Sequence, residues 1–208
     1  PALSTAAVSD PALHSLSVAA PRLGAGALYL HTSPELAMKR LLAAGMGDLY
    51  QMCRVFRDGE VGRWHQPEFT LLEWYRIGFD DHALMDEVAA LLAILAAERF
   101  PHGSHRIAYA AAFEQRLGEP PDAPAATLAA ALPAHGIAVP PAATHRDLVD
   151  LAFAAAVVPG LDPLALTFVT DFPADQAALA ELRGTPPRAA RFEAFCGGLE
   201  LANGFAEL

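Results

Sequence analysis

The chain has 208 residues, of which 53% are hydrophobic, and its formal net charge is −10. This length allows one domain with a sizeable core. No apolar run approaches the roughly 18–20 uncharged residues of a membrane helix, and the first residues lack the basic and apolar regions of a signal peptide. We therefore expect a soluble, cytoplasmic protein without membrane partners. The acidic balance repels a phosphate backbone and argues against nucleic acid as a partner.

The first thirty-two residues predict short extended segments. Residues 1–26 have a loop-like composition, with a candidate short strand at residues 13–18, and residues 27–32, ALYLHT, form an apolar strand candidate. The sequence SPELAMKRLLAAG then predicts a helix with Ser33 as its N-cap, Pro34 at its first helical position and Gly45 at its end. Its expected buried stripe consists of Leu36, Leu41 and Leu42.

A charged hairpin is predicted next. Residues 48–57 and 67–78 are strand-like on either side of residues 59–66, in a stretch that holds four arginines, three glutamates, two tryptophans and a histidine. Strict alternation places one set of side chains on a common face: Leu49, Gln51, Cys53, Val55 and Arg57 from the first strand, and Phe69, Leu71, Glu73 and Tyr75 from the second.

Two interpretations of that face stay open on the residues alone. A charge on a mainly apolar face is costly to bury unless it is paired or meets a ligand. Either Arg57 and Glu73 form a structural ion pair across the hairpin, or the face is the floor of a binding site. His65 by itself is more often an ordinary loop histidine than a catalytic group.

The second half of the chain predicts a helical block between strands. Asp80 or Asp81 caps a long helix that runs to about Phe100. We expect a helical insertion over about residues 81–163, with further helical pieces near residues 109–117, 126–135 and 145–157. Residues 164–172 return to strand, residues 174–183 to a short helix and residues 190–205 to strand. Strands on both sides of a helical block indicate an α+β fold with one sheet.

Three segments together resemble class II aminoacyl-tRNA synthetases, in the version found in the lysyl, aspartyl and asparaginyl enzymes. FR-x-x-E with RWHQPEFTLLEWYR resembles motif 2, HTSPELAMKRLLAAG resembles the segment before it, and GLELANGFAEL resembles the strand with the metal-binding glutamates. The likeness is greatest to bacterial paralogues of lysyl-tRNA synthetase that attach lysine, or its β-isomer, to a lysine of translation elongation factor P. The motifs cover about half the chain, and the helical middle carries none.

The resemblance implies an antiparallel sheet flanked by helices, and an enzyme that uses ATP and Mg²⁺ to form an aminoacyl-adenylate. Because two anions must meet, catalysis rests on positioning and on cations, and the catalytic group implied is Arg57, on the α-phosphate. The implied lysine-binding residues are Ser33, Pro34, Glu35, Glu73, Tyr75, Asn203 and Glu207. The implied ATP-binding residues are Arg57, Asp58, Gly59, Glu60, His65, Gln66, Phe69, Glu200 and Leu201.

The implied magnesium ligands are Glu200 and Glu207. They are seven residues apart, so strict alternation would place them on opposite faces of a strand. A bulge or turn at Asn203-Gly204 would return them to one side, although the same pair is also a common hairpin turn. Ser33 likewise has a purely local alternative, as a helix cap.

The chain departs from the family pattern at several points. The motif 2 glutamate is expected two places after the arginine, where this chain has Gly59, and Glu60 is the nearest acid; Gln66 stands where asparagine is commoner. Pro1 resembles the proline after the motif 1 helix. We therefore expect a partial class II catalytic domain over residues 1–208, inactive alone, with motif 1 upstream and motif 3 downstream.

Three functions remain open at this point. The favoured one is the ligase acting on elongation factor P, a homodimer that does not use tRNA. The alternatives are a lysyl-tRNA synthetase fragment, which would need an OB-fold for tRNA, and a non-catalytic paralogue that binds nucleotide.

Overall fold

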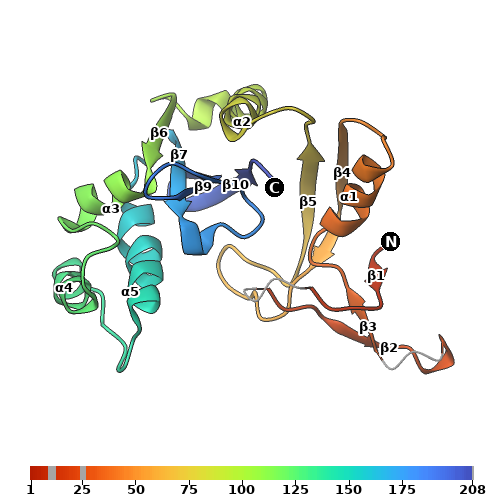
Figure 1. The fold of residues 1–208 in the computed structure, drawn as a ribbon, viewed down its shortest axis with the longest axis horizontal. Helices are drawn as coiled ribbons and strands as arrows, with labels where there is room; N and C mark the ends of the chain where they lie inside the picture. Colours follow the sequence, from red (N-terminus) through yellow and green to blue (C-terminus); the bar gives the residue numbers. More distant parts are fainter. Residues whose placement is uncertain (9–12, 24–26, 208) are drawn as a thin grey trace. The chain divides into compact units, whose positions relative to one another are not determined.

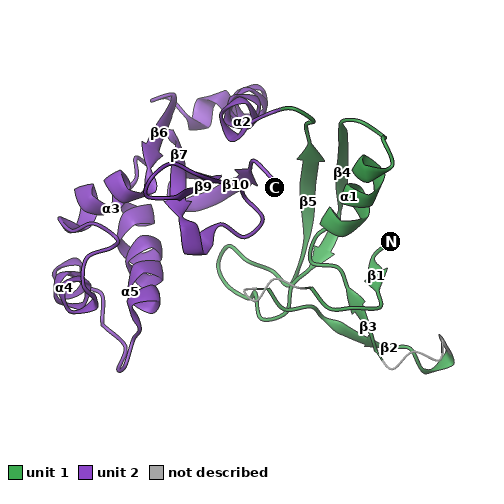
Figure 2. Cartoon of the chain, in the orientation of Figure 1, with its two compact units in different colours: residues 1–78 green, residues 79–208 purple. Residues whose placement is uncertain are grey.

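The computed structural model describes residues 1–8, 13–23 and 27–207 (Figure 1). The chain forms two compact units, Pro1–Gly78 (unit 1) and Phe79–Leu208 (unit 2), which Figure 2 colours separately. No helix in the described ranges is both long and apolar enough to span a membrane. The mixed α+β class is confirmed, but the strands are distributed over three sheets where one was expected.

Unit 1 begins with a small antiparallel sheet in a region expected to be mostly loop. Its strands are β1 (Leu3–Ser4), β2 (Ser17–Ala19) and β3 (Ala27–Leu30), in the order β1-β3-β2, with a 3₁₀ turn at Pro21–Leu23. The strand predicted at residues 13–18 therefore starts later, and residues 13–16 are not part of a strand.

Helix α1 (Glu35–Ala43) confirms the predicted helix with two corrections. Pro34 is the cap residue and the helix begins at Glu35, one residue later than expected. The buried residue is Met38, whereas Leu36 and Leu41 are exposed by 66% and 41%. Side chains four residues apart share a helix face, so the inward stripe runs through positions 34, 38 and 42, and Leu36 points away from it.

The predicted charged hairpin is present. Strands β4 (Leu49–Phe56) and β5 (Glu68–Tyr75) pair antiparallel, with Gln51 opposite Glu73 and Val55 opposite Phe69. Because opposite residues project to the same side, the face predicted from alternation is confirmed.

Unit 2 is built on a five-stranded sheet in the order β10-β9-β7-β6, with β8 beside β9. Its strands are β6 (Ser104–Ala108), β7 (Leu166–Pro173), β8 (Leu182–Arg183), β9 (Arg188–Cys196) and β10 (Leu199–Phe205). β6 pairs parallel with β7 and the other pairs are antiparallel. β6 lies inside the region expected to be helical, so that block is interrupted by a strand.

The helices of unit 2 match the predicted pieces closely. They are α2 (Asp81–Ala96), α3 (Tyr109–Leu117), α4 (Ala125–Ala131), α5 (His145–Ala152), a π-helical turn at Phe153–Val157 and α6 (Val158–Gly160), with 3₁₀ turns at Ala97–Arg99 and Leu132–His135. Asp80 caps α2 by accepting a hydrogen bond from the amide of Ala83 at 2.8 Å. The helix expected at residues 174–183 is only a 3₁₀ turn, Ala174–Gln176.

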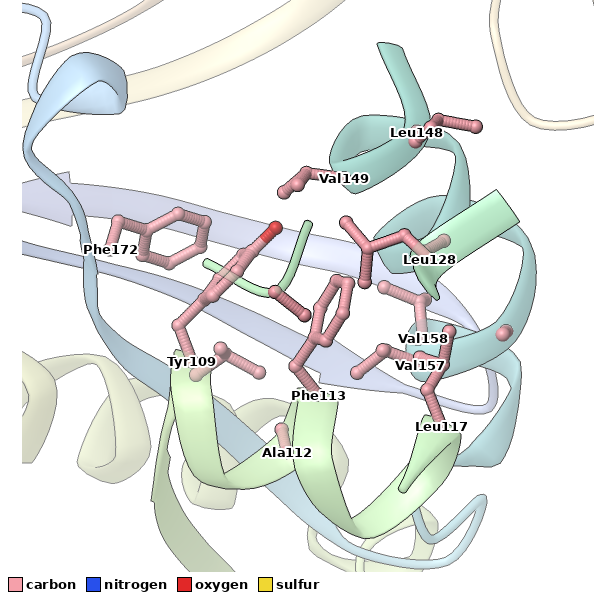
Figure 3. Close-up of a cluster of buried hydrophobic side chains, with 14 of the residues drawn as sticks. Tyr109, Ala112, Phe113, Leu117, Leu128, Leu148, Val149, Val157, Val158 and Phe172 are labelled. Carbon is pink, nitrogen blue, oxygen red and sulfur yellow. The ribbon is translucent and has the colours of Figure 1, made fainter. Parts of the chain in front are cut away.

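The core of unit 2 lies between the sheet and its helices. α2 packs against β9 and β10, and α3 packs against β6 and β7. Figure 3 shows the cluster on the α3 side, where the Tyr109 and Phe113 rings lie among aliphatic side chains of α4, α5 and α6. Tyr109 also stacks on Phe153 at 4.6 Å and contacts Phe172 at 5.0 Å between ring centroids. This core holds β7 and β9 in place.

The β9–β10 hairpin turns at Gly197 and Gly198, both with positive φ, as a two-residue hairpin loop requires. The interpretation of Asn203-Gly204 as a turn is therefore wrong, since both residues lie within β10. A Cβ on Gly204 would lie 2.5 Å from the Phe192 ring, so the glycine is explained by close packing.

Candidate functional site

Arg57 lies just past β4, where three contacts orient its guanidinium group. Its Nε donates to the Thr32 carbonyl at 3.4 Å, its Nη1 is 3.6 Å from the Glu60 carboxylate, and its Cζ lies 5.1 Å from the centre of the Phe69 ring. A quarter of the side chain remains exposed. Such a guanidinium is pre-oriented and still accessible, which suits the binding of a phosphate or carboxylate.

Glu73, on the same face of the hairpin, receives two hydroxyl donors. Ser33 donates to one carboxylate oxygen at 2.6 Å and Tyr75 to the other at 2.9 Å. Ser33 also accepts from the amide of Glu35 at 2.9 Å, so its local role at the helix start and its contact with Glu73 exist together. Burial raises the pKa of the Cys53 thiol, and the charge of Glu73 raises it further, which agrees with their common face.

A direct ion pair between Arg57 and Glu73 is not part of this arrangement. Glu73 is opposite Gln51, six residues before Arg57, and six residues of strand span about 20 Å. The two side chains instead reach consecutive residues, Thr32 and Ser33, at the junction of β3 and α1. The interpretation as a structural ion pair is therefore wrong. Instead, the guanidinium of Arg57 and the carboxylate of Glu73 lie on either side of the Thr32–Ser33 segment.

The hairpin tip carries the remaining predicted ATP-binding residues of unit 1. Gly59 has φ of +79° in a turn, which favours glycine, and this moves the acid to Glu60, beside Arg57. Asp58, His65 and Gln66 are exposed. The structure therefore brings Glu60 and Phe69 to Arg57, while the contacts that orient the guanidinium do not include His65 or Gln66.

Glu35 has a nearby partner of its own. Lys39, one turn along α1, lies 2.7 Å from the Glu35 carboxylate. Glu35 is thus close to Ser33 in sequence, but its carboxylate is oriented by the lysine and is only 31% exposed. A ligand amine at Glu35 would compete with Lys39.

In unit 2, a bulge places the candidate residues of β10 on one side. Glu200 is opposite Phe195 and Ala202 is opposite Ala194, so Leu201 is the extra residue. After this shift, Glu200 and Asn203 project to the same face. The expectation of a bulge is confirmed, but it lies at Leu201 and not at Asn203-Gly204. Glu207 itself forms a bridge with Ala180.

Two residues of β9, Glu193 and Arg191, lie on the same face, and neither was predicted from the sequence. Glu193 is opposite Asn203, and Arg191 contacts the Glu193 carboxylate and donates to the Asn203 side-chain oxygen at 3.3 Å. Burial raises the pKa of Glu193 to about 7, the charge of Glu200 adds to the rise, and Arg191 opposes it. A hairpin with Gly197 and Gly198 as its turn places Glu200 opposite Phe195, two residues from Glu193 on the same side, and this spacing was the signal in the sequence for bringing the two acids together.

The sequence matches a known family and several known proteins. The family model described as tRNA synthetases class II (D, K and N) matches residues 8–208. The chain is 47% identical to the elongation factor P--(R)-beta-lysine ligase of Vibrio cholerae, 46% to that of Vibrio vulnificus and 45% to that of Pseudoalteromonas translucida. All of this chain aligns in each case, and it spans 65–66% of the length of these relatives.

Proposed function

Since the chain belongs to the class II tRNA synthetases of the D, K and N group, we propose that the protein is a ligase that attaches lysine or β-lysine to translation elongation factor P. The observation that carries this proposal is identity of 43–47% along the whole chain to proteins named elongation factor P--(R)-beta-lysine ligase. Such a protein would act in the cytoplasm, as a homodimer, with a protein and not tRNA as acceptor.

The proposed reaction has two steps. A carboxylate oxygen of the amino acid attacks the α-phosphorus of ATP, pyrophosphate leaves, and an aminoacyl-adenylate remains. The ε-amine of the acceptor lysine then attacks the carbonyl carbon, loses a proton and displaces AMP. Neither step needs a nucleophile from the enzyme, so its task is to position the reactants and offset their charge.

Arg57 fits the first step because its guanidinium is oriented by Thr32, Glu60 and Phe69 before any ligand arrives. A donor held in advance does not lose orientational freedom when charge develops on the α-phosphate. Asp58, His65 and Gln66, on the exposed tip, would contact the nucleotide when it binds. Stacking of Phe69 on adenine is the remaining part of this proposal.

Glu73 would bind an amine of the amino acid. Its carboxylate is oriented by Ser33 and Tyr75, and a carboxylate held in this way can favour an ammonium group through a charge-assisted hydrogen bond. Pro34 and Glu35 would line the same region of unit 1.

Magnesium fits the carboxylates of unit 2. The described residues hold no group of three or more His, Cys, Asp or Glu side chains arranged for a metal, but Mg²⁺ is usually held by one or two carboxylates together with substrate phosphates. Burial raises the pKa of Glu193 and the charge of Glu200 raises it further, and a divalent cation would offset the repulsion between the two carboxylates. When bound, the ion would neutralise phosphate charge. The proposed magnesium and nucleotide site also includes Glu207 and the backbone of Leu201.

The test is mass spectrometry of purified elongation factor P after incubation with the full-length protein, ATP, Mg²⁺ and either lysine or (R)-β-lysine. Bulk tRNA serves as a parallel acceptor. A mass gain of one lysine residue on the protein and none on tRNA is the expected result. Charging of tRNA would show a lysyl-tRNA synthetase instead, and nucleotide binding without reaction on either acceptor would favour a non-catalytic paralogue.

A further inference from the structure

Arg191 connects three separate segments of unit 2 through one guanidinium group. Its Nε donates to the Asn203 side-chain oxygen at 3.3 Å, its Nη1 donates to the Gln176 carbonyl at 3.1 Å, and its Nη2 contacts the Glu193 carboxylate. The same group lies over the Phe172 ring, 4.7 Å from its centre. The side chain is only 17% exposed, so its position is set by the protein on nearly every side.

This contact determines which end of the Asn203 amide is available. An asparagine side chain has one acceptor oxygen and one NH₂ group with two donors. Arg191 has donors only, so it must face the Asn203 oxygen. The NH₂ group then points away from the guanidinium, and Asn203 is exposed. A ligand at Asn203 therefore meets hydrogen-bond donors.

We propose that Arg191 is a positioning residue that holds Asn203 with its NH₂ group toward the ligand, so that Asn203 binds the carboxylate of the amino-acid substrate. The inference rests on the proposed function, which supplies an amino acid as the ligand. The carboxylate is the group of lysine or β-lysine that accepts hydrogen bonds, whereas both amines are donors when charged. Arg191 itself does not touch the substrate.

Geometry also explains why lysine cannot replace Arg191. The planar guanidinium spreads its donors over three fixed directions, toward Asn203, Gln176 and Glu193, while a lysine ammonium is a single point charge on a flexible chain. Arg191→Lys keeps the charge beside Glu193 but cannot keep all three contacts. The Asn203 amide is then free to rotate.

The first test measures binding of L-lysine and (R)-β-lysine to the full-length protein by calorimetry, without ATP or Mg²⁺. We expect Arg191→Lys to weaken binding about tenfold, the lower end of the 10–100-fold loss that follows removal of the hydrogen-bond partner of a metal ligand. Cadaverine, which is lysine without its carboxylate, is the matched ligand, and its affinity should not change. Arg183→Lys is the matched control: Arg183 pairs with the buried Asp81, so we expect a lower Tm and unchanged lysine affinity.

Asn203→Asp tests the orientation directly, and its exposed position protects the fold. The new side chain still accepts from Arg191 but presents an oxygen in place of NH₂, so lysine binding should weaken by at least about tenfold through repulsion of its carboxylate. Combined with Asn203→Ala, Arg191→Lys should add no further loss, because it acts through Asn203.

Three outcomes would overturn the inference. These are wild-type lysine affinity in Arg191→Lys, undiminished lysine binding by Asn203→Asp, or an equal loss for cadaverine and lysine. If the proposed function is wrong, the wild-type protein itself would bind neither L-lysine nor (R)-β-lysine. The ligand assigned to Asn203 would then be wrong as well.

Discussion

The two compact units differ in what holds their side chains in place. In unit 2, aromatic and aliphatic residues from six helical segments and the sheet form one buried cluster, part of which Figure 3 shows. In the described part of unit 1, the buried hydrophobic side chains are Leu28, Met38 and Val55. On the face of the hairpin opposite that of Glu73, Tyr50 and Met52 are exposed by 76% and 65%.

This difference separates the main source of stability from the groups that orient Arg57 and Glu73. Apolar burial supplies most of the free energy of folding, so unit 2 should contribute the larger share. Unit 1 instead orients Arg57 and Glu73 by hydrogen bonds and ion contacts from Thr32, Ser33 and Glu60. Substitutions in the core of unit 2 should therefore affect folding, and substitutions of the polar groups in unit 1 should affect catalysis.

The largest expected effect breaks the core of unit 2. Phe113 is fully buried and packs beside Tyr109, so Phe113→Ala should lower the free energy of unfolding by about 3–5 kcal/mol. Urea denaturation followed by circular dichroism measures this loss. The contrast is Leu36→Ala in unit 1, at a side chain exposed by 66%, which should change stability by less than about 0.5 kcal/mol. Equal losses in both variants would contradict the comparison.

The next effect lies in unit 1 and concerns catalysis. Arg57→Ala should lower adenylate formation by two to three orders of magnitude, about 3–4 kcal/mol, because a pre-oriented charge donor is lost. Lysine-dependent pyrophosphate exchange in the full-length protein is the measurement. Arg54→Ala is the matched control, since Arg54 is 64% exposed and pairs with Glu68 on the other face. Near-normal exchange in Arg57→Ala would refute the proposed role.

Glu73 gives a smaller effect that should appear in substrate affinity. Glu73→Gln keeps the shape and one of the two acceptor oxygens but removes the charge, so the KM for lysine should rise roughly 30- to 100-fold, about 2–3 kcal/mol. Glu68→Gln changes the same residue type on the opposite face of β5, where we expect no change in KM. If both variants have the same KM, Glu73 does not bind the amine.

Local sequence patterns predicted the parts of the fold that depend on neighbours along the chain. Alternation identified the facing residues of β4 and β5, because strand geometry leaves only two sides. Cap and end signals located α1 and the start of α2 within one or two residues, whereas α2 ends at Ala96, four residues before the expected end. The same alternation assigned Arg57 and Glu73 to one face of the hairpin, although their separation along it came from the register.

Features that depend on distant partners were not predictable in this way. β6, SHRIA, is short and polar, and it is a strand because β7 pairs with it. The sequence predicts Leu36 as a core residue, and only the packing of α1 shows that its side chain is exposed. The bulge at Leu201 is a matter of register between β9 and β10, and it places Asn203 opposite Glu193. For this reason Glu193 and Arg191 were missed.

The smallest expected effect tests whether the buried carboxylate of Glu193 lowers the stability of unit 2 when it is ionised. The pKa of Glu193 is raised from 4.5 to about 7 by burial and by Glu200, so folding favours its protonated form. Its contribution to stability is present below about pH 4.5 and is lost as pH rises through about 7. Glu193→Gln does not titrate, so its Tm relative to wild type should rise between pH 5 and pH 8 by a few degrees, since 1 kcal/mol corresponds to about 2–4 °C at this chain length. Scanning calorimetry in EDTA measures the difference, and Mg²⁺ at pH 8 should raise the wild-type Tm more than that of the variant. A difference that does not change with pH would show that the buried carboxylate carries no such cost.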